Sequence, residues 1–171
     1  GFEYTVGDSV LDFVYFTTDL KNLITYANST YSNGSGTSNR HGAEMKFNSL
    51  IADNVYWRNS ATFTVAEDGN GTRVTRRPKW MGLTAIDYKK DSWTNTVEYL
   101  HTGSHLDIDS STYATITKPA VGVVNLHTSK VVNDKSDVVL SVNNAFDKTY
   151  DRPDGYAQHG RNILLTYKLK F

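Results

Sequence analysis

The residues of this sequence that could support metal or acid–base chemistry are five histidines and a few closely spaced acidic side chains. The densest group is His105, Asp107 and Asp109, whose oxygen ligands could bind a cation. The group lacks the glycine and the bidentate glutamate of a calcium-binding loop. The other histidines are dispersed along the chain. We therefore predict no metal site, and we expect these side chains to be exposed, solvated loop residues.

The sequence also contains no motif for nucleophilic catalysis or for cofactor binding. Cysteine is absent, which excludes disulfides, thiolate catalysis and zinc sites of the cysteine type. No Ser/His/Asp order, paired carboxylates, phosphate-binding loop or dinucleotide fingerprint is present. The 18 basic and 18 acidic residues give no net charge, so a broad nucleic-acid-binding surface is not expected. The sequence therefore predicts a protein that is not an enzyme, without catalytic residues or a cofactor.

Two arginines and the aromatic residues are the remaining candidates for ligand contact. Arg76 and Arg77 form a basic pair that suits an anionic ligand and equally suits the phosphates of a membrane surface. Trp57, Trp80 and Trp93, together with 11 tyrosines, could form a surface on which sugars stack. Aromatic girdles at the two interfaces of a membrane barrel explain them more simply.

The elements that must position these residues are strands. Tyrosine is frequent, only three prolines occur, and no apolar run approaches the roughly 18 residues that a membrane helix needs. Alternating apolar and polar positions indicate nine strand segments. These are residues 1–6, 10–28, 37–49, 55–65, 79–88, 93–102, 120–130, 137–145 and 162–171. We therefore predict an all-β fold.

The connections between these strands alternate in length. Short turns follow the first, third, fifth and seventh strands, and long polar connections follow the second, fourth, sixth and eighth. Transmembrane β-barrels show this asymmetry, with short periplasmic turns and long extracellular loops. The fourth strand has the clearest two-sided pattern, with Trp57 and Phe63 on one face and Arg58 and Thr62 on the other. We therefore predict an antiparallel transmembrane barrel whose apolar face meets lipid.

The last quarter of the chain, residues 143–171, carries the most specific signal. Asn144, Phe146, Asp147, Lys148 and Tyr150 are followed by Gly155, Tyr156, Gly160 and Arg161, and the final strand ends on Phe171. This ordered set resembles the carboxy-terminal signature of TonB-dependent outer-membrane receptors. The segments LKNLITYAN, GAE and RRPKW are similar to other parts of the same family. They look closest to its cobalamin-receptor branch, with siderophore and haem receptors next.

The resemblance implies a 22-stranded barrel with a plugged lumen in the outer membrane of a Gram-negative bacterium. Residues 1–171 would be its carboxy-terminal part, about strands 14–22, and the plug domain would lie outside this chain. Nine strands cannot close an antiparallel barrel, because the first and the last would then be parallel. Gly1 also reads as part of a strand already under way. We therefore expect further strands before it.

The function that the resemblance implies is uptake of a scarce, bulky nutrient, a cobalamin or an iron–siderophore or haem, with energy transmitted by TonB. The implied partners are TonB, the amino-terminal barrel and plug segment, outer-membrane lipid and lipopolysaccharide, and the barrel-assembly machinery. The candidate ligand contacts in the loops are Tyr31, Arg76, Arg77, His105, Tyr113, Tyr156 and His159. The residues expected to face the lumen or plug are Lys46, Arg58, Glu98, Lys168 and Lys170, and the expected assembly signal is Tyr167, Leu169 and Phe171.

Two other interpretations fit part of the pattern. The chain could be a small stand-alone outer-membrane barrel of adhesion or structural type, with eight strands and no transport. It could also be a soluble carbohydrate-binding β-sandwich, which its aromatic, asparagine and glycine content would suit. Extraction behaviour separates a sandwich from a barrel, because only a membrane barrel should require detergent and resist SDS until heated.

Overall fold

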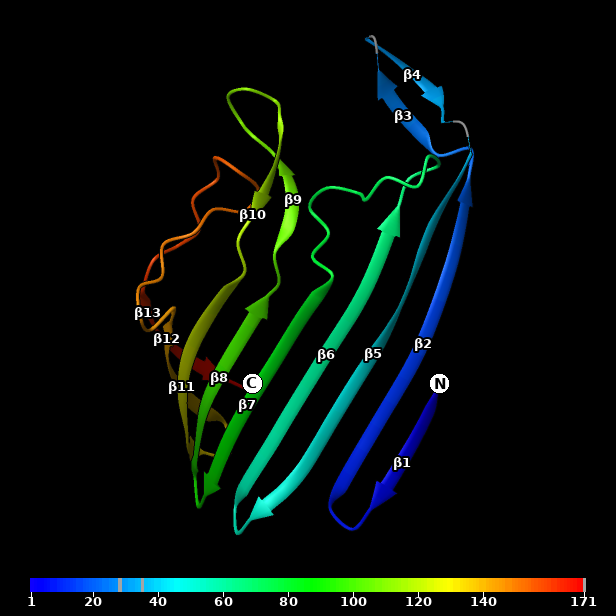
Figure 1. The fold of residues 1–171 in the computed structure, drawn as a ribbon. Coiled ribbons are helices and arrows are strands. Elements are labelled where there is room, and N and C mark those ends of the chain that lie inside the picture. The colour runs from blue at the N-terminus through cyan, green and yellow to red at the C-terminus, as the bar shows by residue number, and fades with distance from the viewer. Residues whose placement is uncertain (28, 35, 171) are drawn as a thin grey trace.

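A single antiparallel sheet of nine strands dominates the computed structural model, which describes residues 1–27, 29–34 and 36–170 (Figure 1). Its strands are β1 (Phe2–Val6), β2 (Ser9–Lys21), β5 (Thr37–Ala52), β6 (Val55–Glu67), β7 (Trp80–Lys90), β8 (Trp93–Thr102), β11 (Val121–Asn133), β12 (Ser136–Asn143) and β13 (Asn162–Leu169). Each strand pairs with the next one in this order, so the sheet is a simple meander. The predicted all-β fold and the nine strands are confirmed.

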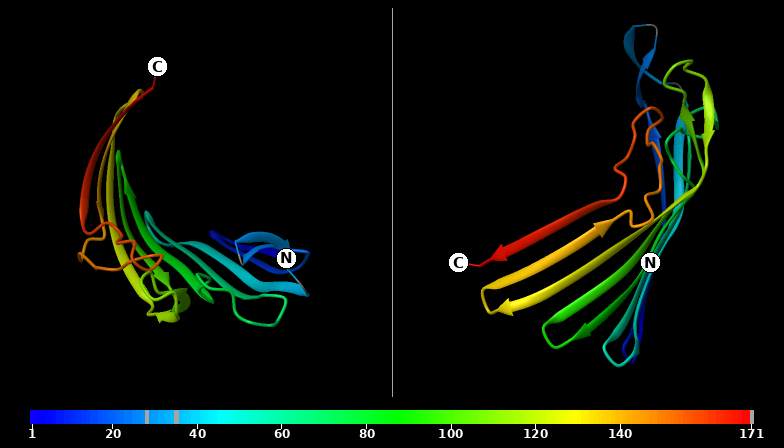
Figure 2. Two further views of the ribbon diagram at one scale, coloured as in Figure 1. Left: turned by 90° about the horizontal axis from the view of Figure 1, so that it is seen from above. Right: turned by 90° about the vertical axis from the view of Figure 1, so that its left-hand side faces the viewer.

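The sheet is curved like a segment of a barrel wall, as its view from above shows (Figure 2). Strands β1 and β13 form its two edges among the described residues. Two further sheets are present, but each has only two strands. The architecture therefore lacks the paired large sheets of a sandwich, and the carbohydrate-binding sandwich is not supported. In the described part of the chain, no helix is long and apolar enough to cross a membrane.

Short and long connections lie at opposite ends of the sheet, as predicted (Figure 1). The short turns are residues 7–8, 53–54, 91–92 and 134–135. Gly7, Asn54 and Asp91 in these turns have φ angles of 54°, 63° and 53°, which suit tight hairpins between right-twisted strands. The long connections are residues 22–36, 68–79, 103–120 and 144–161. The predicted alternation of short turns and long connections is therefore present, with each kind at its own end of the sheet.

Two of the long connections contain hairpins that the sequence analysis placed in strands or loops. The second predicted strand was extended to residue 28, but β2 ends at Lys21. Asn22 has a φ of 55°, which turns the chain out of the sheet, and β3 (Ile24–Ala27) then pairs with β4 (Thr30–Asn33). In the third long connection, β9 (His105–Ile108) pairs with β10 (Thr115–Lys118).

Cross-strand partners lie on the same face of a sheet, so the pairing register defines two faces. One row that crosses six strands is entirely apolar and runs Trp57, Ile86, Val97, Leu126, Val142, Ile163. The adjacent row on the other face runs Asn48, Arg58, Ala85, Glu98, Asn125. We call the first face the apolar face and the second the polar face. Apart from the register shifts near Leu50 in β5 and Val131 in β11, every second residue of a strand belongs to the apolar face, as the alternation predicted.

The two faces also differ in how tightly their side chains pack. On the apolar face, Leu165 remains 70% exposed, although it lies in the middle of β13. On the polar face, Ala85, Asp87 and Asn125 are only 1%, 5% and 8% exposed. Side chains converge on the concave side of a curved sheet, so this burial places the polar face on the inside of the curve. The apolar face is therefore convex, and no other described strand packs against it.

Candidate functional site

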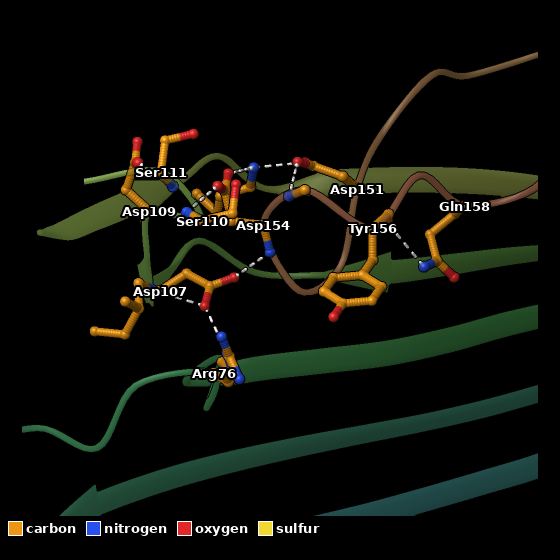
Figure 3. Close-up of polar contacts among 12 residues, drawn as sticks. Arg76, Asp107, Asp109, Ser110, Ser111, Asp151, Asp154, Tyr156 and Gln158 are labelled. Carbon is orange, nitrogen blue, oxygen red and sulfur yellow. Dashed lines mark hydrogen bonds and ion pairs between the residues drawn. The ribbon is translucent and has the colours of Figure 1, made fainter. Parts of the chain in front are cut away.

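The candidate site lies at the end of the sheet from which the four long connections project. Strands β6, β7, β8, β11, β12 and β13 bring the last three of these connections to one side of the molecule (Figure 1). Residues 68–79, 103–120 and 144–161 then contact each other through charged side chains (Figure 3). We call the five residues that make these charged contacts the three-loop cluster: Arg76, Asp107, Lys118, Asp151 and Asp154.

Asp107 is the centre of the three-loop cluster and is completely buried. It lies in β9, and its Oδ1 accepts hydrogen bonds from Nε of Arg76 at 2.7 Å and from the backbone N–H of Ile108 at 2.8 Å. Its Oδ2 accepts the backbone N–H of Asp154 at 2.8 Å. One carboxylate therefore joins all three connections. The backbone N–H of Arg76 also donates to the carbonyl of Leu106 at 2.6 Å, which fixes the arginine beside β9.

Lys118, at the end of β10, makes the second link between the connections. Its Nζ lies 2.5 Å from Oδ1 of Asp151 and 2.8 Å from Oδ1 of Asp154. The same two aspartates also accept backbone hydrogen bonds, Asp151 from Gly155 at 3.0 Å and Asp154 from Ser110 at 2.9 Å. Each aspartate therefore has both a cationic partner and a backbone donor, which fixes the loop of residues 151–155 against the β9–β10 hairpin.

The electrostatics of the three-loop cluster favour the charged forms of its three aspartates and of Lys118. Burial alone would raise the pKa of Asp107, but hydrogen bonds from Arg76, Ile108 and Asp154 hold that pKa below its ordinary value. The hydrogen bond from Lys118, with support from Ser110, lowers the pKa of Asp154 to about 2. The two aspartates in turn raise the pKa of Lys118. The cluster is therefore a set of permanent ion pairs at neutral pH and not a proton donor or acceptor.

The turn of the β9–β10 hairpin presents a tyrosine to solvent. The carboxylate of Asp109 accepts the backbone N–H groups of Ser111 and Thr112, at 2.9 and 2.7 Å. The backbone N–H of Tyr113 donates to the carbonyl of Asp109 at 3.0 Å. Tyr113 itself is 80% exposed and has a φ of 59°, a conformation that side-chain-bearing residues rarely adopt. The hairpin therefore holds this aromatic ring outward on a fixed turn.

The first two long connections also meet. Gly36 has a φ of 82°, and a Cβ atom at this position would overlap the carbonyl oxygen of Gly69. Only glycine allows this close approach of two backbones. A shallow cavity lined by Leu23, Asn33, Asp68 and Asn70 lies beside the contact. Together with the three-loop cluster, this contact links all four connections into one continuous rim.

Below the rim, the polar face carries a second set of buried polar contacts. Arg58 and Asp87 form a two-point ion pair, with Nε–Oδ2 and Nη2–Oδ1 distances of 2.5 and 3.1 Å, and Thr96 donates to Oδ1 of Asp87 at 2.6 Å. Asn125 donates to Glu98 at 3.0 Å. These groups line the concave side of the wall with hydrogen-bonding atoms, a surface that water or a polar protein segment can contact.

Asn144 connects this wall to the last long connection. Its side chain bonds the backbone N–H and C=O of Lys148, both at 2.8 Å, and the carbonyl of His159 at 3.2 Å. Its backbone N–H donates to Oδ1 of Asn125 at 3.0 Å. A cavity of about 580 Å³ lies between the polar face and this connection, and its lining includes Arg152 and His159. Asn144 therefore shapes one wall of this cavity.

The predicted loop residues all lie at the end of the sheet with the long connections, but they do not form one pocket. Arg76 and His105 join the packed region, whereas Tyr113 and Tyr156 are 80% and 67% exposed. The others are distributed over three connections: Tyr31 in β4, Arg77 before β7, and His159 beside the large cavity. Their role in ligand contact stays a prediction.

The expectation that His105, Asp107 and Asp109 are solvated is wrong for two of the three. His105 is 6% exposed, and its ring Nδ1 lies 3.1 Å from the carbonyl of Gly103, while Asp107 is fully buried. Both are buried because β9 packs against residues 76 and 154, which lie far away in the sequence. No group of three or more potential metal ligands occurs among the described residues.

The residues predicted to face the lumen share the polar face where the register includes them. Lys46 pairs with Ser60, Arg58 with Ala85, Glu98 with Asn125 and Lys168 with Asp137, all on the polar face. Nζ of Lys170 lies 3.8 Å from Asp137. Of the predicted assembly signal, Tyr167 and Leu169 lie on the apolar face of β13, and Phe171 falls outside the described residues.

Sequence reasoning missed the residues that hold the connections together. Lys118, Asp151, Asp154 and Asn144 bond across loops, yet none was a candidate. The motif around Asn144 was recognised only as a family signature. Its pattern of a helix-free turn rich in Asn, Asp and Gly could have indicated side-chain bonds to the backbone. No local sequence pattern predicts the ion pairs of Lys118 with residues 151 and 154.

A family model described as TonB dependent receptor-like, beta-barrel, matches residues 1–145. The chain belongs to the TonB-dependent receptor family. Family members with this barrel are integral proteins of the Gram-negative outer membrane, so this segment lies in that membrane. The matched range ends just inside the closing stretch that the sequence analysis singled out.

The chain is also similar to one protein by sequence and to two solved structures by fold. The chain is 30% identical over 161 residues to the vitamin B12 transporter BtuB of Vibrio cholerae. This alignment covers 89% of the chain but only 25% of the transporter, so the chain spans about a quarter of the length of its curated relatives. Its fold is similar to that of the ferric enterobactin receptor PfeA of Pseudomonas aeruginosa (TM-score 0.83, 16% identity, 99% of this chain and 30% of that chain). It is also similar to the ferric citrate transporter FecA (TM-score 0.81, 20% identity, 99% and 30%).

Proposed function

We propose that residues 1–171 are the carboxy-terminal part of the barrel domain of an active-transport receptor, with the plug supplied by another part of the protein. The receptor takes up a scarce, bulky nutrient, a cobalamin or an iron–siderophore or haem, with energy transmitted by TonB. The similarity to the vitamin B12 transporter supports cobalamin as the first ligand to test. No bond of the nutrient is broken, because the residues that meet at the site are permanent ion pairs and not acid–base catalysts.

The observation that carries this proposal is the continuous rim formed by the four long connections. Charged contacts join residues 68–79, 103–120 and 144–161 of the rim, which lies at the end of the polar, concave wall. A nutrient captured at the rim therefore meets hydrogen-bonding groups along the wall rather than lipid. The polar face, including Lys46, Arg58 and Glu98, supplies the surface that faces the plug and the passing nutrient.

The exposed residues of the rim are the proposed ligand contacts. Tyr113 and Tyr156 project from two different connections, and Arg77 is an exposed cation for which no ion pair is formed within the described residues. Arg76 acts differently, because its Nε is already bonded to Asp107. We therefore assign Arg76 to positioning of the rim and Arg77 to contact with the nutrient or with lipopolysaccharide phosphates at the outer surface. Insertion of the barrel requires the barrel-assembly machinery, which reads the end of β13.

Uptake by cells tests this function. A strain that lacks the full-length receptor is complemented with the wild type and supplied in parallel with radiolabelled cobalamin, a labelled iron–siderophore or labelled haem. We expect one of the nutrients to accumulate, and we expect accumulation to stop when TonB is removed. Uptake that does not depend on the receptor, or that persists fully without TonB, would contradict the proposal.

Tyr113 permits a sharper test of ligand contact. Tyr113→Gly removes the ring and relaxes the backbone at φ 59°, whereas Tyr113→Ala removes the ring and keeps the strained backbone. If the ring contacts the nutrient, both variants raise the nutrient concentration needed for half-maximal uptake by the same factor. If only the turn conformation matters, Tyr113→Gly keeps wild-type uptake and the ring has no role.

A further inference from the structure

The apolar face carries an unusual row of residues at the end of the short turns. Lys90 in β7 is the cross-strand partner of Trp93 in β8, and Trp93 is the partner of Lys130 in β11. The row continues with Val138 in β12 and Tyr167 in β13. Two lysines therefore flank one tryptophan on the face that meets lipid.

Three of the five side chains in this row, the two lysines and the tryptophan, are available to a ligand. Lys90, Trp93 and Lys130 are exposed, and Trp93 retains 45% of its surface. Nζ of Lys130 lies 5.0 Å from the centroid of the Trp93 ring, a cation–π contact that holds the ammonium close to the indole. Neither lysine forms an ion pair with a carboxylate within the described residues, although Asp91 is next in sequence to Lys90.

The two ends of the apolar face carry different sets of charged side chains. Near the long connections the register places both acidic and basic residues on this face, with Asp19 opposite Asn39, Asn39 opposite Glu67, and Lys21 opposite Thr37. Near the short turns, Lys90 and Lys130 are the only charged side chains that the register places on this face within the described strands. In this family the short turns are periplasmic, so the positive end of the face lies in the periplasmic leaflet.

We propose that Lys90, Trp93 and Lys130 bind the phosphate-bearing headgroup of an anionic phospholipid in the periplasmic leaflet of the outer membrane. Lys90 and Lys130 are two strands apart, about 10 Å at the backbone, and both side chains are long enough to reach a single phosphodiester between them. Trp93 lies between them and packs its ring against the glycerol and upper acyl carbons, where indoles in membrane proteins are found. This site is independent of nutrient uptake.

The full-length receptor in detergent micelles tests the site with brominated lipids, which quench tryptophan emission on contact. We expect brominated phosphatidylglycerol to quench Trp93 at a lower mole fraction than brominated phosphatidylethanolamine. The Trp93→Phe receptor identifies the part of the signal that Trp93 contributes. Each of Lys90→Gln and Lys130→Gln should reduce the preference for phosphatidylglycerol by about fivefold, which corresponds to about 1 kcal/mol per lysine.

Lys89→Gln is the matched control for these two substitutions. Lys89 precedes Lys90 in the same strand and also lies over an aromatic ring, with Nζ 4.7 Å from the centroid of Tyr56, but it faces the opposite side of the sheet. Its removal should leave the lipid preference unchanged. The proposed site would be overturned if wild type and the Lys90→Gln/Lys130→Gln receptor had the same preference for phosphatidylglycerol, or if Lys89→Gln lost as much of it. Lys90 and Lys130 would then be solvated lysines without a lipid ligand.

Salt provides a second test, in which the result for the wild-type receptor does not depend on the folding of any variant. A phosphate contact between exposed charges weakens as salt rises, because the Debye length shortens to about 3 Å at 1 M. The preference for phosphatidylglycerol should therefore decrease between low and high salt, and Lys90→Arg/Lys130→Arg should retain it at low salt. A preference that does not change with salt would contradict a phosphate site.

Discussion

On the two faces of the nine-stranded sheet, different kinds of side-chain contact join one part of the chain to another. Aromatic contacts on the apolar face join direct neighbours, such as Phe63 with Trp80, whose ring centroids lie 4.7 Å apart. Among the described residues, all five ion pairs lie on the polar face or in the connections above it. Several of them join residues far apart in sequence, such as Arg76 and Asp107.

This difference separates two tasks in one sheet. The apolar face satisfies a requirement that is the same along its whole area, contact with lipid, and needs only the correct residue at every second position. The polar side must fix particular loops in particular places, so it uses directed bonds between specific partners. Substitutions on the apolar face should therefore affect the whole protein, and substitutions on the polar side should affect one region.

The largest effect is expected when a charge is moved from one face to the other in β6. Phe63→Lys places an ammonium on the lipid face, at about 2–4 kcal/mol near the midplane and less towards the interfaces. Thr62→Lys introduces the same group one residue away on the polar face, opposite Glu44. We expect the first variant of the full-length receptor to lose the heat-modifiable folded band in SDS gels, and the second to keep it. Leu140→Arg should repeat the loss in β12. Equal yields of folded receptor for Phe63→Lys and Thr62→Lys would contradict the assignment of the faces.

A local effect is expected from Asp107. Asp107→Ala leaves Arg76 and two backbone N–H groups without their acceptor, at about 1–3 kcal/mol for each buried donor left unpaired. Hydrogen exchange should accelerate in residues 150–156 while the sheet stays protected. Asp109→Ala is the control, because Asp109 also accepts two backbone N–H groups but only within its own hairpin turn. Unchanged exchange in residues 150–156 would show that Asp107 does not join the connections.

The smallest effect concerns pH. Lys118 holds the pKa of Asp154 at about 2, below its ordinary 3.8, so this contact stabilises the loops above pH 3.8 and is lost as the pH falls through about 2. The pKa of Lys118 is raised from 10.5, so its contribution is lost only as the pH rises beyond that value. The distribution of distances between spin labels attached at positions 113 and 156 should therefore be constant from about pH 5 to 9. It should broaden only in strong acid. A transition near neutral pH would mean that another group controls the loops.

The parts of this structure that the sequence predicts are those set by local patterns. The alternation of Trp57 and Phe63 with Arg58 and Thr62 defines both faces of β6, because side chains of a strand point to opposite sides at every residue. The alternation of short and long connections likewise predicted the two ends of the sheet.

The parts that escaped prediction depend on partners distant in sequence. Asp107 was expected to be solvated, but its carboxylate oxygens accept hydrogen bonds from donors 31 and 47 residues away. No local sequence pattern predicts such pairs. The end of β2 was missed for a different reason. The residues after Asn22 keep a strand-like composition, and they do form strand, but in a separate hairpin.

The central claim, that this sheet is a barrel wall with one face in lipid, can be tested position by position, because residues 1–171 contain no cysteine and any cysteine elsewhere in the receptor can be replaced first. Single cysteines at residues 138–142 of β12, carrying spin labels in the full-length receptor reconstituted in lipid, report contact with oxygen in the bilayer and with a water-soluble nickel reagent. We predict that positions 138, 140 and 142 contact oxygen and that 139 and 141 contact the nickel reagent. Uniform accessibility along these five positions, or the reverse alternation, would contradict the account.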